Sequence, residues 1–532
     1  MYTGGEDESS SDDEFMSANS CPTRFCDQGI FTVSQEKSLQ KSYFDMTNDV
    51  SLRCGYSEKF IQATSIEKNS TNEDALVCSN TPAQKPIPNN ISNFIFNREM
   101  GYSRGSSSKV PFISRPYTGS FTCGQRVFLN NQFIPNQRRR VDVVKSKTFC
   151  VSYIDNGEGL LTASQDHRLR LYRRKGPRRR FIRTKFVEVP YVGWSILDVC
   201  VSPDGRDVIY STWNDNIYQC SITGNDKDEY WQPFRVNPKD SRFAIFSLRF
   251  NNNGSEIVAG STDGLYIYNR EVNRCVLSIQ AHEDDINAVC FGDHSSHIIL
   301  SGADDGLCKV WDRRTMGEFM YAKPVGVFAG HRDGITFIDS RGDDRYLLTN
   351  SKDQTIKVWD LRHFSSEAGI SSTKHAVSNQ KWDYRWQCTP DSIFKMTNLA
   401  GDSSLLTIRG HSVLNTLIRA RFSPDHTGKR YIYTGCARGN CIVYDLYSGE
   451  LLKKYPGHKS VVRDCMWHPT ENEIVTSAWD GETSLWKYDE RAARNINPDS
   501  YISGDEDSCD ENYQPIRQRY RMCRRDRCHG KA

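Results

Sequence analysis

Short runs of alternating apolar and polar residues fill the middle of this 532-residue chain. The first runs lie at 141–144, 149–154, 160–164 and 169–172, and glycine and aspartate residues bound them. Apolar residues at every second position between such turns are typical of short antiparallel strands. The pattern therefore predicts an all-β fold that begins near Val141.

The same group of strands recurs as far as residue 487. We expect six further units: strands at 196–201, 208–212 and 217–220; strands at 246–250, 256–259 and 265–268; two units around Trp311 and Trp359; strands at 417–422, 431–435 and 441–445; and strands at 461–467, 474–477 and 484–486. Repeats of this length are typical of a β-propeller, in which each unit forms one blade.

Two neighbouring units are close copies, SGADDGLCKVWDRR at 301–314 and NSKDQTIKVWDLR at 350–362. In each copy a turn aspartate, Asp305 or Asp353, stands six residues before a tryptophan that is followed by Asp-x-Arg. A Gly-His pair precedes several of the units, for example at 330–331. This order of Gly-His, Asp and Trp-Asp predicts an all-β, seven-bladed WD-repeat β-propeller with disordered N- and C-terminal extensions.

A blade of this kind is expected to hold a buried hydrogen-bonded relay that fixes the strand register. The relay joins the histidine, a Ser or Thr on the second strand, the turn aspartate and the tryptophan. We predict a complete relay of His331, Ser351, Asp353 and Trp359. Partial relays are predicted where Ala303 and Ala478 stand at the hydroxyl position, from His282, Asp305 and Trp311 and from His458, Asp480 and Trp486.

The ring must close, because an open edge strand invites aggregation. The sequence after Trp486 is charged and offers no fourth strand, so we predict that 141–144 completes the seventh blade. The chain then divides into a disordered acidic and polar leader at 1–110, a linker with short ordered pieces at 111–140, the propeller at 141–487 with insertions at 173–190 and 363–407, and a disordered charged tail at 488–532. We expect no amphipathic helix within residues 1–130.

Composition excludes several classes of function. The net charge of +3 gives no global case for nucleic acid, which is not an expected partner. No segment approaches the ~20 consecutive apolar residues of a membrane span, and no apolar signal segment begins the chain. We therefore expect no membrane partner and a location in the nucleus and cytoplasm. The 18 cysteines, many of them scattered in apolar strands, are expected to be reduced thiols.

No catalytic constellation is present. The chain lacks a phosphate-binding glycine loop, a zinc-protease motif and a nucleophile elbow. The histidines at 282, 331, 411 and 458 recur at blade starts, which favours a structural role, and Cys523 with Cys528-His529 lacks a second ligand pair for zinc. We therefore predict that the protein is not an enzyme and has no cofactor and no metal. The arginine-rich segments at 138–140 and 173–180 are interpreted first as solvated loops and second as a nuclear-import or nucleic-acid patch.

Arg314 and Arg362 end the two Trp-Asp-x-Arg segments. Because they follow equivalent strands of consecutive blades, we expect them to emerge side by side on one face of the disc. An arginine fork can bind a partner carboxylate or carbonyl with two hydrogen bonds. The alternative is that each arginine pairs within its own blade, with Asp312 or Asp360.

These two consecutive boxes resemble the double box of the propeller substrate receptors of cullin-4 RING ubiquitin ligases. Longer stretches at 192–199, 281–289, 330–339 and 381–386 extend the resemblance over roughly residues 133–487. It implies that Arg314 and Arg362, with Asp312 and Asp360, dock the propeller onto the ligase's damaged-DNA-binding-protein adaptor. It also implies that the propeller holds protein substrates for ubiquitination and proteasomal degradation.

Three functional hypotheses follow. The first is this non-catalytic receptor, which acts by raising the effective concentration of a substrate lysine near a charged ubiquitin carrier. The second is a WD-repeat scaffold for a nuclear complex outside the ubiquitin system, since one fold serves many partners. An enzyme with a catalytic propeller would need paired carboxylates or a metal cluster at the channel, and the sequence indicates neither.

Overall fold

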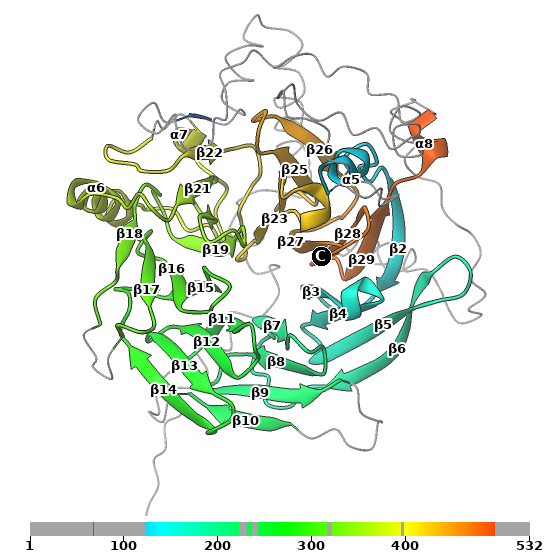
Figure 1. Cartoon of the computed structure of the whole chain (residues 1–532), viewed down its shortest axis with the longest axis horizontal. Helices are drawn as coiled ribbons and strands as arrows, with labels where there is room; N and C mark the ends of the chain where they lie inside the picture. Colours follow the sequence, from blue (N-terminus) through cyan, green and yellow to red (C-terminus); the bar gives the residue numbers. More distant parts are fainter. Residues whose placement is uncertain are drawn as a thin grey trace, which may run out of the picture.

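The computed structural model describes residues 67–68, 123–222, 231–236, 243–316, 322–394 and 398–494. Seven sheets stand like blades around a central axis (Figure 1). The predicted seven-bladed propeller is therefore confirmed. Most of the predicted leader and tail lies outside the described residues.

The strands fall into seven blades, numbered here in chain order. Blade one contains β3 (Thr148–Ile154), β4 (Gly159–Ser164), β5 (Arg168–Lys175) and β6 (Arg180–Glu188); blade two contains β7 (Asp198–Val201), β8 (Asp207–Ser211), β9 (Asn216–Ser221) and β10 (Gln232–Arg235); blade three contains β11 (Ile245–Phe250), β12 (Glu256–Ser261), β13 (Leu265–Asn269) and β14 (Arg274–Ile279). Blade four contains β15 (Ile286–Phe291), β16 (Ile298–Ala303), β17 (Cys308–Asp312) and β18 (Gly326–Phe328); blade five contains β19 (Ile335–Ser340), β20 (Tyr346–Ser351), β21 (Ile356–Asp360) and β22 (Leu406–Ile408), with β1 (Glu67–Lys68) at its edge. Blade six contains β23 (Ala420–Phe422), β24 (Tyr431–Gly435), β25 (Cys441–Asp445) and β26 (Leu451–Tyr455); blade seven contains β27 (Val462–Trp467), β28 (Glu473–Ala478), β29 (Glu482–Lys487) and β2 (Gln137–Val143). The helices are α5 (Cys123–Asn130), α6 (Glu367–Ser378), α7 (Asp391–Phe394) and α8 (Glu490–Arg494), with 3-10 turns η3 (Asp155–Gly157) and η4 (Asp425–Thr427).

Blade seven closes the ring with a strand from the N-terminal side of the propeller. The sheet order is β2-β29-β28-β27, and Gln137 pairs with Lys487 while Val143 pairs with Glu482. Asn136 and Asp489 extend the pairing, since the Asn136 side-chain amide and the Asp489 backbone exchange two hydrogen bonds. The predicted closure is confirmed. The strand begins at Gln137, however, so Arg138 to Arg140 belong to a sheet and not to a loop.

Two expectations about loops and helices were wrong. The basic insertion at 173–190 is chiefly β6 and the end of β5, the outer pair of blade one, joined by a short turn. The insertion at 363–407 is not one of them: it lies between β21 and β22 and contains α6 and α7. A helix, α5, does occur before the propeller: Val127 packs against Gly428, and Asn130 and Asn131 donate hydrogen bonds to the carbonyls of His426 and Thr427.

The core consists of apolar layers between neighbouring blades. One cluster joins blades one and two, others join successive pairs, and the cluster of Tyr153, Tyr172 and Phe181 with Val475 and Leu485 seals blade one against blade seven. Trp311 and Trp359 are almost fully buried in such layers. Alternating side chains serve both layers because each strand faces a neighbour on either side.

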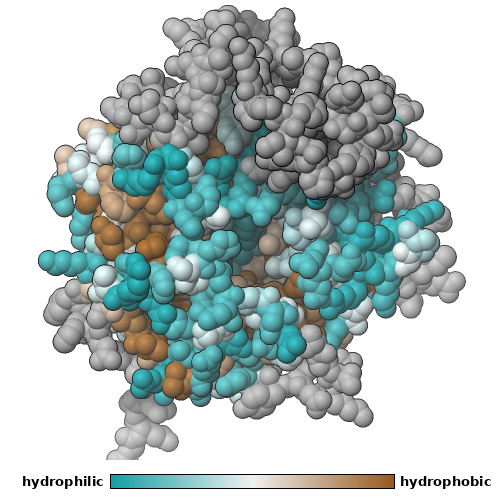
Figure 2. Space-filling model, in the orientation of Figure 1, coloured by the Kyte–Doolittle hydropathy of each residue, from teal (hydrophilic) through white to brown (hydrophobic). Residues whose placement is uncertain are grey.

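Strand direction gives the disc two distinct faces. The turns between first and second strands and between third and fourth strands open on one side, which we call the arginine face because Arg314 and Arg362 lie there. The Gly-His segments and the turns between second and third strands open on the other, the histidine face. Figure 2 shows a largely hydrophilic disc surface, with a hydrophobic area at the left over β16 to β18.

Candidate functional site

Arg314 and Arg362 follow β17 and β21, the third strands of blades four and five. These blades are in contact, since the side-chain amide of Asn287 on β15 donates a 3.0 Å hydrogen bond to the carbonyl of Ile335 on β19. Both arginines therefore leave the disc on the arginine face in neighbouring blades. The side chains are 64% and 55% exposed, respectively.

Each arginine is held by the aspartate two residues before it. Nε and Nη2 of Arg362 donate to the two carboxylate oxygens of Asp360 at 3.0 and 2.7 Å, and the Arg362 backbone N–H donates to the same group. Arg314 repeats this geometry on Asp312 at 2.9 and 2.7 Å. We call each unit an Asp-x-Arg clamp. The clamp uses the Nε and Nη2 donors, which form one edge of the guanidinium. In the described part of the chain, Nη1 of both arginines has no hydrogen-bond partner.

The clamp also fixes the charge of its aspartate. Hydrogen bonds from the Arg314 side chain and backbone lower the pKa of Asp312 to about 2. Burial alone would raise the pKa of Asp360, but hydrogen bonds from Arg362 and Arg345 outweigh burial and lower it. The two sequence interpretations of these arginines are thus compatible: each pairs inside its blade and still presents an exposed edge. Asp312 and Asp360 are covered, so their role is to orient the arginines.

A third clamp was missed by the sequence interpretation. Nε and Nη2 of Arg385 donate to Asp383 at 3.0 and 2.8 Å, within Trp382-Asp383-Tyr384-Arg385. This clamp lies in the insertion, whose Tyr384 ring lies under the Lys352 ammonium at 4.4 Å, on the histidine face. The clamp is therefore a local property of the Asp-x-Arg sequence. What distinguishes Arg314 and Arg362 is their repetition in adjacent blades on one face.

Apolar residues adjoin these two clamps. Val325, just before β18, is 53% exposed, and Phe364 is 39% exposed. The Phe364 ring packs over Gly326 and against Phe328, which in turn contacts Trp359 at 5.3 Å between ring centres. Helix α5 covers blades six and seven on the same face, because it packs on η4 and accepts a hydrogen bond from Asn472. An exposed cationic edge beside apolar surface suits a protein partner.

The relays differ from the prediction in one member. His331 Nε2 lies 2.6 Å from the hydroxyl of Thr349, and Trp359 Nε1 donates to that hydroxyl at 2.8 Å. Ser351 is not in the relay: it donates to the carbonyl of Asp333 and accepts from the backbone of Asp353. His331 Nδ1 lies 3.0 Å from Asp353, as the relay requires.

The relays thought to be partial are complete, so the assignment of Ala303 and Ala478 to the hydroxyl position was wrong. Ser301 links His282 and Trp311 at 2.7 and 2.8 Å, and Thr476 links His458 and Trp486 at 2.8 and 3.3 Å. His282 Nδ1 contacts Asp305, and His458 Nδ1 contacts Asp480. In all three blades the hydroxyl lies ten residues before the tryptophan, a spacing that comparison of the units within the sequence would have found.

Both ring nitrogens of His282, His331 and His458 are therefore engaged in structural bonds. His411 differs, because blade six has Arg438 where the turn aspartate stands elsewhere. His411 Nε2 instead bonds Asn350 of the neighbouring blade at 2.8 Å. Burial lowers the pKa of His411 to about 4.

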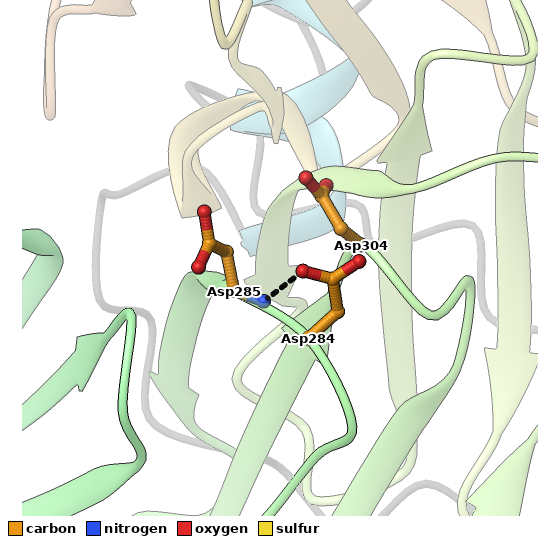
Figure 3. Close-up of side chains that lie close together, drawn as sticks. All are labelled: Asp284, Asp285 and Asp304. Carbon is orange, nitrogen blue, oxygen red and sulfur yellow. Dashed lines mark hydrogen bonds between the residues drawn. The ribbon is translucent and has the colours of Figure 1, made fainter.

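One acidic cluster, Asp284, Asp285 and Asp304, lies on the histidine face (Figure 3). Asp285 donates its backbone N–H to Asp284, and Lys352 Nζ donates to Asp304 at 2.7 Å. Burial, with help from Asp304 and Asp284, raises the pKa of Asp285 to about 6. The lysine ammonium already supplies a cation to the cluster, and we assign no metal to it.

Ion pairs fill the space where the first strands of the blades face the central channel of the propeller. Arg419 bridges Asp198 and Asp464 at 2.6 and 3.0 Å, and Arg463 donates to the carbonyls of Phe149 and Leu197. All of these charged side chains are buried. They join blades far apart in the sequence, so their role is to hold the ring together.

Comparison with known proteins agrees with this architecture. Residues 273–312, 322–360 and 449–487 match the family described as WD domain, G-beta repeat. The chain is similar to a protein of Caenorhabditis elegans named DDB1- and CUL4-associated factor 11 homolog, with 46% identity over 83% of this chain and 76% of the relative. The protein of the same name from Caenorhabditis briggsae is 44% identical over 76% of this chain and 75% of its own length. The LEC14B protein of Lithospermum erythrorhizon is 43% identical over 56% of this chain and 64% of its own length.

Proposed function

Because this chain belongs to the family of the DDB1- and CUL4-associated factor 11 homologs, we propose that it is a substrate receptor of a cullin-4 RING ubiquitin ligase. In this role it docks to the ligase's DDB1 adaptor and presents substrate proteins for ubiquitination and proteasomal degradation. It contributes no catalytic group of its own. Holding a substrate lysine near the charged ubiquitin carrier raises its effective concentration, which is sufficient for a receptor.

The observation that carries the docking assignment is the pair of Asp-x-Arg clamps on the arginine face. Each clamp pre-orients a planar guanidinium and leaves one edge exposed. Such an edge can donate to a carboxylate or carbonyl of the adaptor with little further loss of side-chain freedom. Two clamps in adjacent blades present these donors together, and Val325 and Phe364 add apolar area beside them.

The remaining surface for substrates is the histidine face. There the insertion, with Trp386 76% exposed, lies near the acidic cluster of Asp284, Asp285 and Asp304. Separation of the two contacts on opposite faces allows adaptor and substrate to bind at once.

The docking assignment is tested with the double variant Arg314→Ala/Arg362→Ala in the full chain. Co-purified DDB1 adaptor should fall at least tenfold, while the melting temperature stays within about 2 °C because both side chains are exposed. Arg385→Ala, which removes the third clamp, is the matched control and should retain the adaptor. Normal recovery of the adaptor by the double variant would show that docking uses another surface.

The alternative is a scaffold for a nuclear complex outside the ubiquitin system. Mass spectrometry of proteins that co-purify with the tagged chain distinguishes the two: a receptor recovers the adaptor and cullin, and the scaffold does not.

We also propose that the protein acts in the nucleus and cytoplasm. The ten cysteines whose side chains the structure describes are free thiols, which supports a reducing compartment. Separately, the helices of the described residues include no candidate membrane span.

A further inference from the structure

The fold brings two arginine-rich segments together at the rim of blades seven and one. Strand β2 carries Arg139, and the β5–β6 hairpin beside it carries Lys175, Arg178, Arg180 and Arg183 (Figure 1). Asp142 on β2 joins them, since it accepts hydrogen bonds from Tyr172 at 2.8 Å and Arg183 at 3.3 Å. We call these five cationic residues the basic rim.

The basic rim has more positive charge than its surroundings neutralise. All five residues of the basic rim are exposed to solvent. In the described part of the chain, Lys175, Arg178 and Arg180 have no ion-pair partner, whereas the neighbouring Arg179 is satisfied by Glu158 and Glu471. Uncompensated charge at the tip of a hairpin attracts an acidic ligand.

An acidic ligand is tethered close by. The run at 505–511 contains Asp505, Glu506, Asp507, Asp510 and Glu511. The described chain ends in α8 at Arg494, directly after Asp489 is fixed to Asn136 at the start of β2. Ten residues separate Arg494 from Asp505. A chain of ten residues spans at most ~35 Å.

We propose that the acidic run at 505–511 docks on the basic rim of the same chain. The tether gives the run an effective concentration on the order of millimolar, so even weak ion pairs populate the bound state. A second acidic run, at 6–14, is more than one hundred residues from α5 and gains much less from its tether. The docked run shields the rim from other acidic ligands, and it does so in blades seven and one, away from Arg314 and Arg362 in blades four and five.

The proposal is tested by zero-length carbodiimide crosslinking of the full chain. Lys175 should form an amide with a carboxylate of the 505–511 run, and 0.5 M salt should reduce the yield several-fold because it screens exposed ion pairs. The variant Arg139→Glu/Arg178→Glu/Arg180→Glu, which retains Lys175, should lose at least fivefold of this link. The matched control, Arg274→Glu/Lys323→Glu/Lys454→Glu, reverses exposed charges in other blades and should crosslink like the parent.

A second measurement does not depend on the crosslinking chemistry. Replacement of the five tail carboxylates by amides should speed trypsin cleavage at Arg178 and Arg180 several-fold, with the melting temperature unchanged. A mixture of isotopically heavy and light chains shows whether each link is intramolecular. Links found between chains only, links to the 6–14 run in place of 505–511, or an oligonucleotide that binds the parent rim while no tail link forms, would each overturn the proposal.

Discussion

The indole Nε1 of Trp359 donates a 2.8 Å hydrogen bond to the hydroxyl of Thr349. The same hydroxyl lies 2.6 Å from Nε2 of His331. Since a hydroxyl has one proton to donate, it accepts from the indole and donates to the imidazole, which then donates from Nδ1 to Asp353. One oxygen thus serves both rings in the centre of blade five.

Replacement of this hydroxyl should therefore destabilise the propeller. Thr349→Val keeps the volume but leaves His331 Nε2 and Trp359 Nε1 without partners in a buried site, which costs about 2–3 kcal/mol. Thr349→Ser keeps the hydroxyl, as Ser301 does in blade four, and should lose less than about 1 kcal/mol. Chemical denaturation measures both. Equal stability of the Val and Ser variants would contradict the relay.

The aspartates of the clamps should affect docking less than the arginines. Asp312→Asn with Asp360→Asn removes the charge that orients each guanidinium but leaves an amide oxygen as acceptor. We expect adaptor affinity to fall only about threefold, roughly 0.7 kcal/mol, mainly through faster dissociation. Surface plasmon resonance with immobilised adaptor provides the measurement, and Asp383→Asn is the control. An effect as large as that of the double arginine variant would mean that the carboxylates contact the adaptor themselves.

Loss of β2 should open the ring. Deletion of residues 1–146 removes the strand that pairs with β29 and exposes the layer around Leu485 and Val475. We expect insoluble protein or a melting temperature lower by more than about 10 °C, because the edge and the apolar layer become exposed together. Deletion of residues 1–110 keeps α5 and β2 and should melt like the full chain. Differential scanning fluorimetry of the two truncations tests this.

Stability should fall under mild acid because of His411. Its pKa in the folded chain is about 4, below the ~6.5 of the unfolded chain. Between these values the unfolded chain binds more protons, so stability falls as the pH drops from about 6.5 to about 4, by at most ~3 kcal/mol for this group. His411→Gln should flatten the melting temperature between pH 7 and 5, relative to the parent. The control His363→Gln, at an exposed position, should show the same pH dependence of the melting temperature as the parent. If His411→Gln also keeps the parent's pH dependence, another group causes the effect.

The repeated units were predictable because their signals are local. Alternation, turn aspartates and the Trp-Asp endings recur within about forty residues, and each unit forms its own sheet. The clamps are local as well, since Asp360 and Arg362 are two residues apart. The relay hydroxyl was misassigned because Thr349 and Ser351 point to the same side of β20, and periodicity cannot choose between them. Ser351 lies at the strand end, where the turn backbone uses it.

The sequence by itself determined the blades, their number and the clamps that Asp312 and Asp360 make with their arginines, because these depend on residues close together in the chain. The tertiary structure alone decided which residues far apart in sequence meet. It paired β2 with β29 across more than three hundred residues, placed α5 on the arginine face, and set β2 beside the β5–β6 hairpin. The physical reason is that a closed ring must pair its last edge strand with a segment that can reach it. A pattern of apolar residues does not show which distant segment that is.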